Sequence, residues 1–223
     1  MTNRERFTAV LNGKPADRLP VVEWASWWNE TFSEWQKQGL DEKWTADKLY
    51  DYYGLDTLVQ AWINHRMPGF PEPKEHGHEI MQDEHDYEHL KKMMFSEEYM
   101  HQCMQYFKSI KSQHEAGHFA LWYTIEGFFW FPRTLFGIEN HLYAFYDYPE
   151  LMHRINQDQT DYMLMFLEEM YKVVTPDFMT FAEDMSYNHG PMLSKDCYDE
   201  FIKPYYREII PFIKSKGTKV FID

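Results

Sequence analysis

Apolar side chains recur every three or four residues in several stretches of the chain, and residues that start or stop helices bound each stretch. Thr2 or Asn3 caps the first of these stretches, and Gly13 ends it. Ser194 caps the last, in which Pro204 must kink or restart the helix because proline lacks a backbone N–H. The pattern predicts further helices over residues 27–39, 45–53, 96–116, 128–146 and 147–174. The helix over residues 128–146 is expected to have short breaks at Pro132 and Gly137.

Short runs of apolar and aromatic residues between these helices indicate β-strands. They cover residues 19–24, about 56–62, 118–127, 176–184 and 218–223. Strands that alternate with helices are typical of βαβ units, which build a parallel sheet. Residues 65–88, rich in proline and glycine, are expected to form a loop with a small hairpin. Neither a repeat nor a linker interrupts the pattern, so we expect a single α/β domain over residues 1–223.

The composition is that of a globular protein, because 44% of the residues are hydrophobic and 26% are charged. A formal net charge of −14 argues against nucleic acid and anionic membranes as partners, since both are polyanions. The polar N-terminus lacks the apolar core of a signal peptide, and no apolar run is long enough to span a membrane. Two cysteines, Cys103 and Cys197, make no disulfide scaffold and fit a reducing compartment. These features predict a cytoplasmic protein.

Several of the predicted strands end in a carboxylate. These acids are Glu23, Glu126, Glu183, Asp184 and Asp223. The carboxyl ends of parallel strands meet at one edge of a sheet or barrel, where α/β enzymes hold their active sites. One acid there would be explained by a solvated strand end, but several favour a shared site. Converging carboxylates need a cation, which can be a metal ion, a substrate ammonium group or a proton in transfer.

Two other features of the sequence are weaker candidates for a functional site. The segment HGHEIMQDEHDYEH holds four histidines, namely His76, His78, His85 and His89. They could bind a metal, but their polar surroundings, rich in proline and glycine, favour a solvated loop. Cys197 falls in the first turn of a helix, where the dipole can lower the pKa of a thiol, although a packing role is favoured.

The opening NRERFTAVLNGKPADRLPV resembles the first stretch of uroporphyrinogen decarboxylase family proteins. EDMSYNHGPMLSKDCYDEFIKPYYREIIPFIKSKGTKVFID is similar to their later stretch, in which an acid-aromatic-Gly-Pro loop precedes a helix with an internal proline. GFFWFPRTLFGIENHLYAFYDYPELMHRI also fits the middle of the family. The resemblance runs along most of the chain, and its most specific part extends from Glu183 to Pro204.

The resemblance implies a (β/α)8 barrel, which agrees with the alternation of strands and helices. Such a barrel has eight strands, whereas the pattern yields about five, and the last lies at the end of the chain. We therefore expect a TIM barrel of the uroporphyrinogen decarboxylase type that is incomplete, with its C-terminal part missing from this chain.

The family includes true decarboxylases and cobalamin-dependent methyltransferases that act with corrinoid proteins. True decarboxylases hold substrate carboxylates with an arginine-rich motif after the first strand and carry an aspartate at the end of the second. Here the stretch VEWASWWNETF, which follows the first predicted strand, contains no arginine. Gln60 occupies the position of the aspartate at the end of the second strand. Since arginine forks bind carboxylates, both departures favour the methyltransferase branch. Members related to coenzyme M methyltransferases hold zinc late in the barrel, and those ligands would lie beyond Asp223.

The resemblance thus implies an enzyme that moves a methyl group between a methylated small molecule and a corrinoid (cobalamin) cofactor on a partner protein. Glu183 and Asp184 would polarise or position the substrate or a metal, and Tyr187 and His189 would supply hydrogen bonds or proton transfer. The substrate-binding residues expected beside them are Glu23, Trp24, Trp122, Glu126, Phe181 and Asp223.

Two other functions stay open. One is uroporphyrinogen III decarboxylation in porphyrin biosynthesis. The other is a non-catalytic module that binds a substrate or a corrinoid protein. The sequence does not distinguish a monomer from a homodimer.

Overall fold

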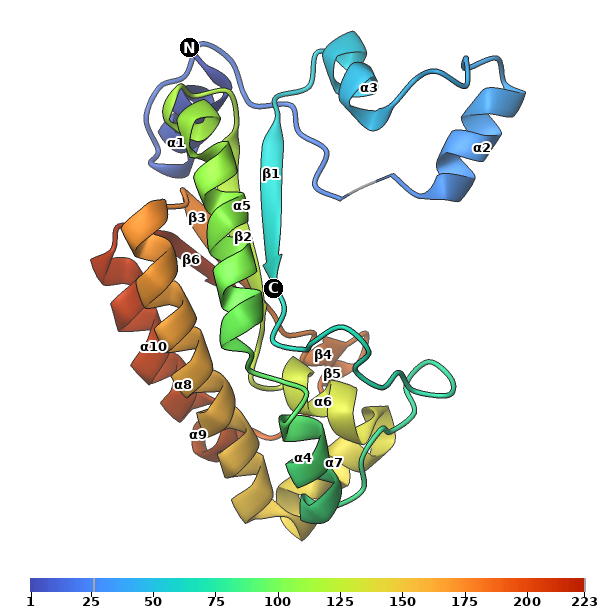
Figure 1. The fold of residues 1–223 in the computed structure, drawn as a ribbon, viewed down its shortest axis with the longest axis vertical. Coiled ribbons are helices and arrows are strands. Elements are labelled where there is room, and N and C mark those ends of the chain that lie inside the picture. The colour runs from blue at the N-terminus through green and yellow to red at the C-terminus, as the bar shows by residue number, and fades with distance from the viewer. Residues whose placement is uncertain (26, 223) are drawn as a thin grey trace. The chain divides into compact units, whose positions relative to one another are not determined.

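The computed structural model describes residues 1–25 and 27–222 (Figure 1). The chain forms two compact units. The first contains Met1–Gln60 and Ser112–Trp122, and the second contains Ala61–Lys111 and the residues from Tyr123 onward. The boundary between the units crosses two strands, and a single domain over the whole chain stays a prediction.

The first unit holds short helices and the beginnings of two strands. The helices are α1 (Asn3–Leu11), α2 (Asn29–Lys37) and α3 (Ala46–Tyr53), and the strands are β1 (Leu58–Ile63) and β2 (Ala120–Glu126). The Thr2 side chain accepts from the backbone N–H of Glu5, whose carboxylate accepts from the N–H of Thr2. This capping box explains why α1 starts where the sequence predicts.

The predicted strand over residues 19–24 does not form. Asp56, which is buried, organises this stretch instead. Its carboxylate accepts from the backbone N–H of Val21 and from the guanidinium groups of Arg6 and Arg18. The N–H of Asp56 in turn donates to the carbonyl of Val21. The segment stays irregular because its backbone groups pair with Asp56 and not with a neighbouring strand.

The second unit contains the longest helices and strands β3 (Phe178–Ala182) and β6 (Lys219–Ile222). Its helices are α4 (Glu84–Lys91), most of α5 (Glu97–Glu115), α6 (Trp130–Phe136), α7 (Ile138–Asp147), α8 (Pro149–Val173), α9 (Lys195–Phe201) and α10 (Lys203–Ser215). After β3, the short strands β4 (Ser186–Tyr187) and β5 (Gly190–Pro191) form an antiparallel hairpin.

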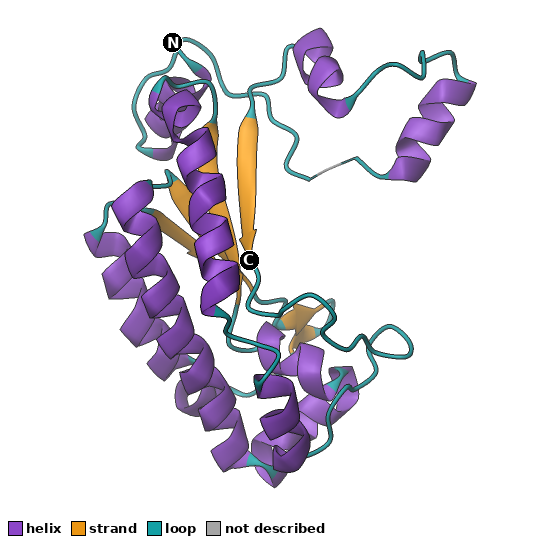
Figure 2. Ribbon diagram, viewed as in Figure 1, coloured by secondary structure: helices purple, strands orange, loops and turns teal. Residues whose placement is uncertain are grey.

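The longer strands form a sheet in the order β1-β2-β3-β6 (Figure 2). Strands β3 and β6 pair in parallel, with Phe178 opposite Lys219 and Phe181 opposite Ile222. Neighbouring strands follow one another in the chain and are joined by helices, which is the arrangement of parallel βαβ units. The mixed α/β class is therefore confirmed, whereas closure into a barrel stays a prediction.

The core of the second unit lies between its helices and the sheet. Helices α8 and α10 pack against each other, and α10 also packs against β6. Helix α8 buries Ile155, Tyr162, Phe166 and Met170, which recur at helical spacing. This apolar layer fixes the positions of the strands and of the loops at their carboxyl ends. Within the described residues, no helix is long and apolar enough to cross a membrane.

Several helix boundaries have local causes. Gly137, with a φ of 78°, separates α6 from α7, as the sequence predicts. The expected break at Pro132 does not form, because this residue lies in the first turn of α6. Pro204 lies in the first turn of α10 and separates this helix from α9, as the sequence predicts. Residues 65–88, expected as a loop, contain the start of α4, which the Asp83 side chain caps.

Candidate active site

Glu183 follows β3 directly and is buried, with 1% of the residue exposed. Its Oε2 accepts hydrogen bonds from the backbone N–H groups of Phe129 and Trp130, each at 3.0 Å. Its Oε1 accepts from the N–H of Phe128 at 2.9 Å and from the hydroxyl of Tyr206. The N–H groups belong to the residues that open α6, so the carboxylate closes the N-terminus of that helix. The four donors match the acceptor positions of a carboxylate.

Gly127 allows the two segments to approach this closely. Its backbone N–H donates to the carbonyl of Ala182 at 2.8 Å, which ties the residue after β2 to the end of β3. A Cβ atom at position 127 would lie 2.1 Å from Cδ of Glu183 and 2.4 Å from its Oε1. Residue 127 must therefore lack a side chain as long as Glu183 keeps its place.

We expect Gly127→Ala to lower the free energy of unfolding by about 1–3 kcal/mol, because the added methyl group must displace the Glu183 carboxylate from its donors. Urea titration followed by circular dichroism measures the change. In the double variant Gly127→Ala/Glu183→Ala the methyl group enters the space that the carboxylate leaves. The loss of unfolding free energy in the double variant should then be smaller than the sum of the losses in the two single variants. A loss equal to that sum would contradict the competition of the methyl group and the carboxylate for the same space.

Burial raises the pKa of Glu183 to about 7, even though the Tyr206 hydroxyl and the three N–H groups stabilise its charged form. Loss of hydration is the larger effect. Near neutral pH, Glu183 is therefore present in both its protonated and its ionised form. Burial and the neighbouring Glu183 carboxylate raise the pKa of Tyr206 well above its ordinary value, so this hydroxyl keeps its proton.

A cavity of about 670 Å³ opens beside Glu183. Its lining residues are Trp62, Trp130, Ala182, Glu183, Asp184, Met185, Ser186 and Ile222. Trp62, Ala182 and Ile222 lie near the carboxyl ends of β1, β3 and β6, so three strands contribute to it. Parallel α/β folds hold their active sites at this edge. We refer to this space as the Glu183 cavity.

Asp184 is the accessible acid of the Glu183 cavity, with 59% of its side chain exposed. Its Oδ2 lies 3.3 Å from Nη1 of Arg133, whose guanidinium carbon lies 4.9 Å from the ring centre of Trp130. Asp184 has a φ of 51°, a left-handed conformation that is uncommon for residues other than glycine. Such strained residues cluster at functional sites, and this one holds a carboxylate at the cavity.

A second acid, Glu126, ends β2 and keeps 15% of its side chain exposed. Its Oε2 lies 2.7 Å from Nη1 of Arg66 and 3.2 Å from Nε2 of His65. Burial acts to raise the pKa of Glu126, but His65 and Arg66 outweigh it and hold the pKa below its ordinary value. Burial lowers the pKa of His65, which is therefore neutral near pH 7. Glu126 is thus a charged carboxylate whose cationic partner is Arg66.

Glu126 and Arg66 line a separate cavity of about 490 Å³, which we call the Arg66 cavity. Arg133 and Trp130 line it as well, so Trp130 is a wall shared with the Glu183 cavity. Both arginines are already paired with a carboxylate, Arg66 with Glu126 and Arg133 with Asp184.

Among the described residues of the second unit, the predicted residues Glu126, Phe181, Tyr187 and His189 do not line the Glu183 cavity. Tyr187 and His189 belong to the β4–β5 hairpin, where their ring centres are 5.5 Å apart and Tyr187 is exposed. Phe181 is fully buried, and its ring contacts that of Tyr206. Side chains alternate between the two faces of a strand, so Phe181 enters the core while Ala182 lines the cavity.

Three predicted residues belong to the first unit. Trp24 and Trp122 are in contact, with ring centres 4.2 Å apart, and Trp122 is buried. The Glu23 carboxylate accepts from Nε1 of Trp27 at 3.0 Å. Substrate binding by these residues stays a prediction, as it does for Asp223, which lies outside the described residues.

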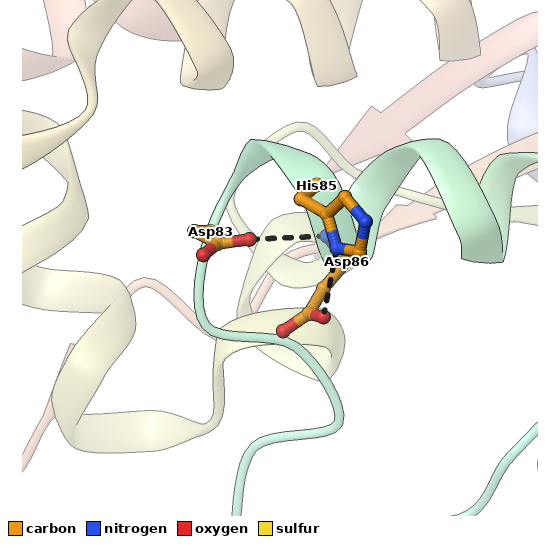
Figure 3. A group of neighbouring side chains, drawn as sticks. All are labelled: Asp83, His85 and Asp86. Atoms are coloured by element: carbon orange, nitrogen blue, oxygen red, sulfur yellow. Dashed lines mark hydrogen bonds and ion pairs between the residues drawn. The ribbon is translucent and has the colours of Figure 1, made fainter.

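The histidine-rich segment contains a group of potential metal ligands at the start of α4 (Figure 3). Ligand atoms of Asp83, His85 and Asp86 lie within 4.8 Å of one another. Asp83 already caps α4, and Asp86 accepts from the N–H of Gln82. Because His85 is 80% exposed and these carboxylates serve the helix start, the group has the character of a solvated surface.

The cysteines are not activated as nucleophiles. Cys197 is buried in α9, and burial raises the pKa of its thiol to about 11. Burial also raises the pKa of the Cys103 thiol. The position of Cys197 near a helix N-terminus does not offset its loss of hydration, so packing is the better account of this residue.

Several side chains that line these cavities or contact Glu126 and Glu183 were not among the predicted site residues, namely Trp62, Trp130, His65, Arg66, Arg133 and Tyr206. His65 and Arg66 come shortly after β1, so the strand-end rule would have found them if it had included basic residues. Arg133 and Tyr206 lie inside helices, where no local pattern marks them. They reach the site through the packing of α6 and α10 near Glu183.

The fold and the cavity together define an α/β protein with an acid-lined site at the carboxyl edge of a parallel sheet. The chain is similar in structure to a methyltransferase from Methanosarcina mazei, with a TM-score of 0.59 and 14% sequence identity. The match covers 100% of this chain and 70% of that protein. At this identity the likeness concerns the fold alone. Neither a protein-family profile nor a curated protein matches the sequence.

Proposed function

We propose that this protein is a methyltransferase that moves a methyl group between a methylated small molecule and a corrinoid carried by a partner protein. The observation that carries the proposal is the fold likeness of the whole chain to a methyltransferase. The acid-lined Glu183 cavity supplies a site at the expected edge of the sheet. The resemblance to a family that includes corrinoid-dependent methyltransferases adds further support.

The proposal includes a (β/α)8 barrel of the uroporphyrinogen decarboxylase type, to which this chain contributes β1, β2, β3 and β6. Sequential strand order with helical crossovers is the arrangement of consecutive units in such a barrel. In that barrel the Glu183 cavity would open at the mouth, where a small substrate and a partner protein can meet.

Methyl transfer needs a methyl carbon held in line between the atom it leaves and the atom it joins. In the proposed reaction Asp184 contacts the substrate, because its carboxylate is accessible in the cavity. Glu183 forms the inner wall, where four hydrogen-bond donors hold its carboxyl group in place, and so positions the substrate. Trp62 and Trp130 form the flat walls. Tyr187 and His189 stay candidates for hydrogen bonds from the β4–β5 hairpin.

The corrinoid enters this scheme as a second substrate, which accepts or supplies the methyl group. Zinc does not fit the Glu183 cavity as the described residues form it. The lining there contains neither histidine nor cysteine, which are the ligands that zinc prefers. No step of the proposed reaction is therefore routed through a metal.

Glu183→Gln tests the proposal through methyl transfer to a reduced corrinoid, followed by visible absorption. We expect kcat/KM to fall about a hundredfold, because the amide turns an N–H group toward the backbone donors of Phe128, Phe129 and Trp130 and displaces the wall that positions the substrate. Glu200→Gln, at an exposed position of α9, is the matched control and should leave the rate unchanged. A wild-type rate in Glu183→Gln would remove this residue from the mechanism. Absence of methyl transfer by the wild-type protein with every methylated donor would refute the function.

One observation favours uroporphyrinogen decarboxylation as a second candidate: Arg66 and Arg133 line the Arg66 cavity. Guanidinium groups suit the carboxylates of that substrate. Their existing pairs with Glu126 and Asp184 make them less available. Formation of coproporphyrinogen by the wild-type protein would establish this candidate. Ligand binding without conversion of either substrate would instead support a non-catalytic binding module.

A further inference from the structure

We propose that the Glu183 cavity binds a cationic methyl donor, a quaternary ammonium compound. The inference names the substrate class of the proposed methyltransferase and rests on that function for its chemistry. The binding can be measured without any turnover.

The charge of the cavity favours a cation. Glu183 and Asp184 both line it, whereas no lysine, arginine or histidine lines it in the part of the chain that the structure describes. Arg133 reaches only Oδ2 of the Asp184 side chain, at 3.3 Å. Oδ1 of Asp184 has no hydrogen-bond partner among the described residues and can face a ligand. An anion in this space would meet two carboxyl groups.

Two indole rings line the same space. Trp62 is 56% exposed, although its neighbours Ala61 and Ile63 in β1 are buried. Trp130 already holds the guanidinium of Arg133 at 4.9 Å from its ring centre. The faces of tryptophan rings attract cations, and aromatic walls are the recognition element for quaternary ammonium groups.

The hydrogen-bonding capacity of the cavity favours a fully methylated cation over one that carries N–H groups. A primary ammonium group presents three donors that need acceptors. The acceptor positions of Glu183 are filled by its four donors, which leaves Asp184 and the Ser186 side chain in the lining. A quaternary ammonium group has no N–H to satisfy, so it loses nothing in such a site.

A quaternary ammonium donor also fits methyl transfer. The bond between the methyl carbon and nitrogen breaks, and its electron pair stays on nitrogen. The leaving group is therefore a neutral tertiary amine that requires no proton. The carbon gains its new bond through the electron pair of the reduced corrinoid on the partner protein. Asp184 would stabilise the positive charge of the bound donor, and the charge leaves the nitrogen as the bond breaks.

Binding of choline and of 3,3-dimethylbutan-1-ol tests the inference, since the second compound has the same shape without the charge. Isothermal titration calorimetry with the wild-type chain, at matched ionic strength, gives both affinities. We expect choline to bind at least about tenfold more tightly, from the two indole faces and the carboxylate together. Equal affinities, or no binding of choline, would overturn the inference.

Two variants should change choline affinity in opposite directions. Asp184→Asn removes the accessible charge, and asparagine tolerates the left-handed backbone at this position, so affinity should fall about tenfold. Arg133→Gln removes the nearby positive charge, so affinity should rise several-fold. Asp199→Asn is the matched control, because it removes a negative charge on α9 outside the cavity lining and should have no effect. An equal loss in Asp199→Asn, or a loss in Arg133→Gln, would contradict a site built by Asp184.

Failure of the inference and failure of the proposed function give different results. Selective choline binding that depends on Asp184, without methyl transfer from any quaternary ammonium donor to a reduced corrinoid, upholds the site and refutes the function. Methyl transfer from uncharged ethers or thioethers, without selective choline binding, upholds the function and refutes the cationic substrate.

Discussion

Replacing Glu183 by alanine is expected to lower the free energy of unfolding by roughly 3–5 kcal/mol. The substitution leaves the N–H groups of Phe128, Phe129 and Trp130 without their acceptor, together with the Tyr206 hydroxyl. Each buried donor without a partner costs about 1–3 kcal/mol, and water entering from the cavity offsets part of the sum. Urea-induced unfolding, followed by circular dichroism, measures the difference.

Two further variants calibrate this result. Glu183→Gln keeps one carbonyl oxygen as an acceptor, so its cost should be smaller, about 1–2 kcal/mol. Glu200→Ala removes an exposed carboxylate and should change stability by less than about 0.5 kcal/mol. A cost below about 1 kcal/mol for Glu183→Ala would contradict the account of Glu183 as the acceptor that closes α6.

The pH dependence of stability should reveal two opposing buried groups, Glu183 and His141. His141 is fully buried between the rings of Phe129 and Phe145, and its ring nitrogens have no hydrogen-bond partner among the described residues. Burial and the nearby Arg133 charge lower its pKa from 6.5 to about 3. The unfolded chain therefore binds more protons at this residue than the folded chain, and stability from His141 is lost as pH falls below 6.5.

Glu183 contributes to the pH dependence of the unfolding free energy with the opposite sign. Its pKa rises from 4.5 in the unfolded chain to about 7 in the folded protein, chiefly through burial. The folded chain binds more protons there, so stability is fully present below pH 4.5 and is lost as pH rises toward 7. Between pH 4.5 and 6.5 the two slopes, each up to about 1.4 kcal/mol per pH unit, nearly cancel.

Single substitutions should separate these slopes. In His141→Leu the Glu183 slope acts alone, so unfolding free energy should fall by up to about 2.7 kcal/mol from pH 4.5 to 6.5, relative to the wild-type profile. In Glu183→Gln it should rise by a similar amount over the same interval. Urea titrations at several pH values give the profiles, and the other titrating groups are common to all three proteins. Profiles of both variants that run parallel to the wild type would show that neither group is perturbed.

The helices and most strands could be predicted because their signals are local. Helix α5 covers Glu97–Glu115 where apolar spacing predicts 96–116, and α8 covers Pro149–Val173 where it predicts 147–174. The segment over residues 19–24 has the composition of a strand, but Asp56, distant in sequence, engages its backbone. Pairing of that kind depends on tertiary structure, and hydrophobic periodicity does not report it.

The candidate site was predictable in position but not in detail. Glu183 and Asp184 were both expected at a strand end, and both line the cavity there. Their environments differ completely. Glu183 is buried and accepts four hydrogen bonds, whereas Asp184 is exposed and has a left-handed backbone conformation. The difference arises from Gly127 and Tyr206, which contact Glu183 from other parts of the chain. Adjacent acids look alike in a sequence until the partners of each are known.

Trp130 lines both the Glu183 cavity and the Arg66 cavity, which has a consequence for how this protein can diversify. A substitution that shortens this side chain enlarges two binding spaces at once and also removes the ring on which Arg133 rests. A single change at Trp130 therefore alters the size of the largest ligand that each of the two cavities can accept. Adaptation to a bulkier ligand in one space must proceed through Trp62 or Phe70, which line one cavity each, if the other is to keep its selectivity.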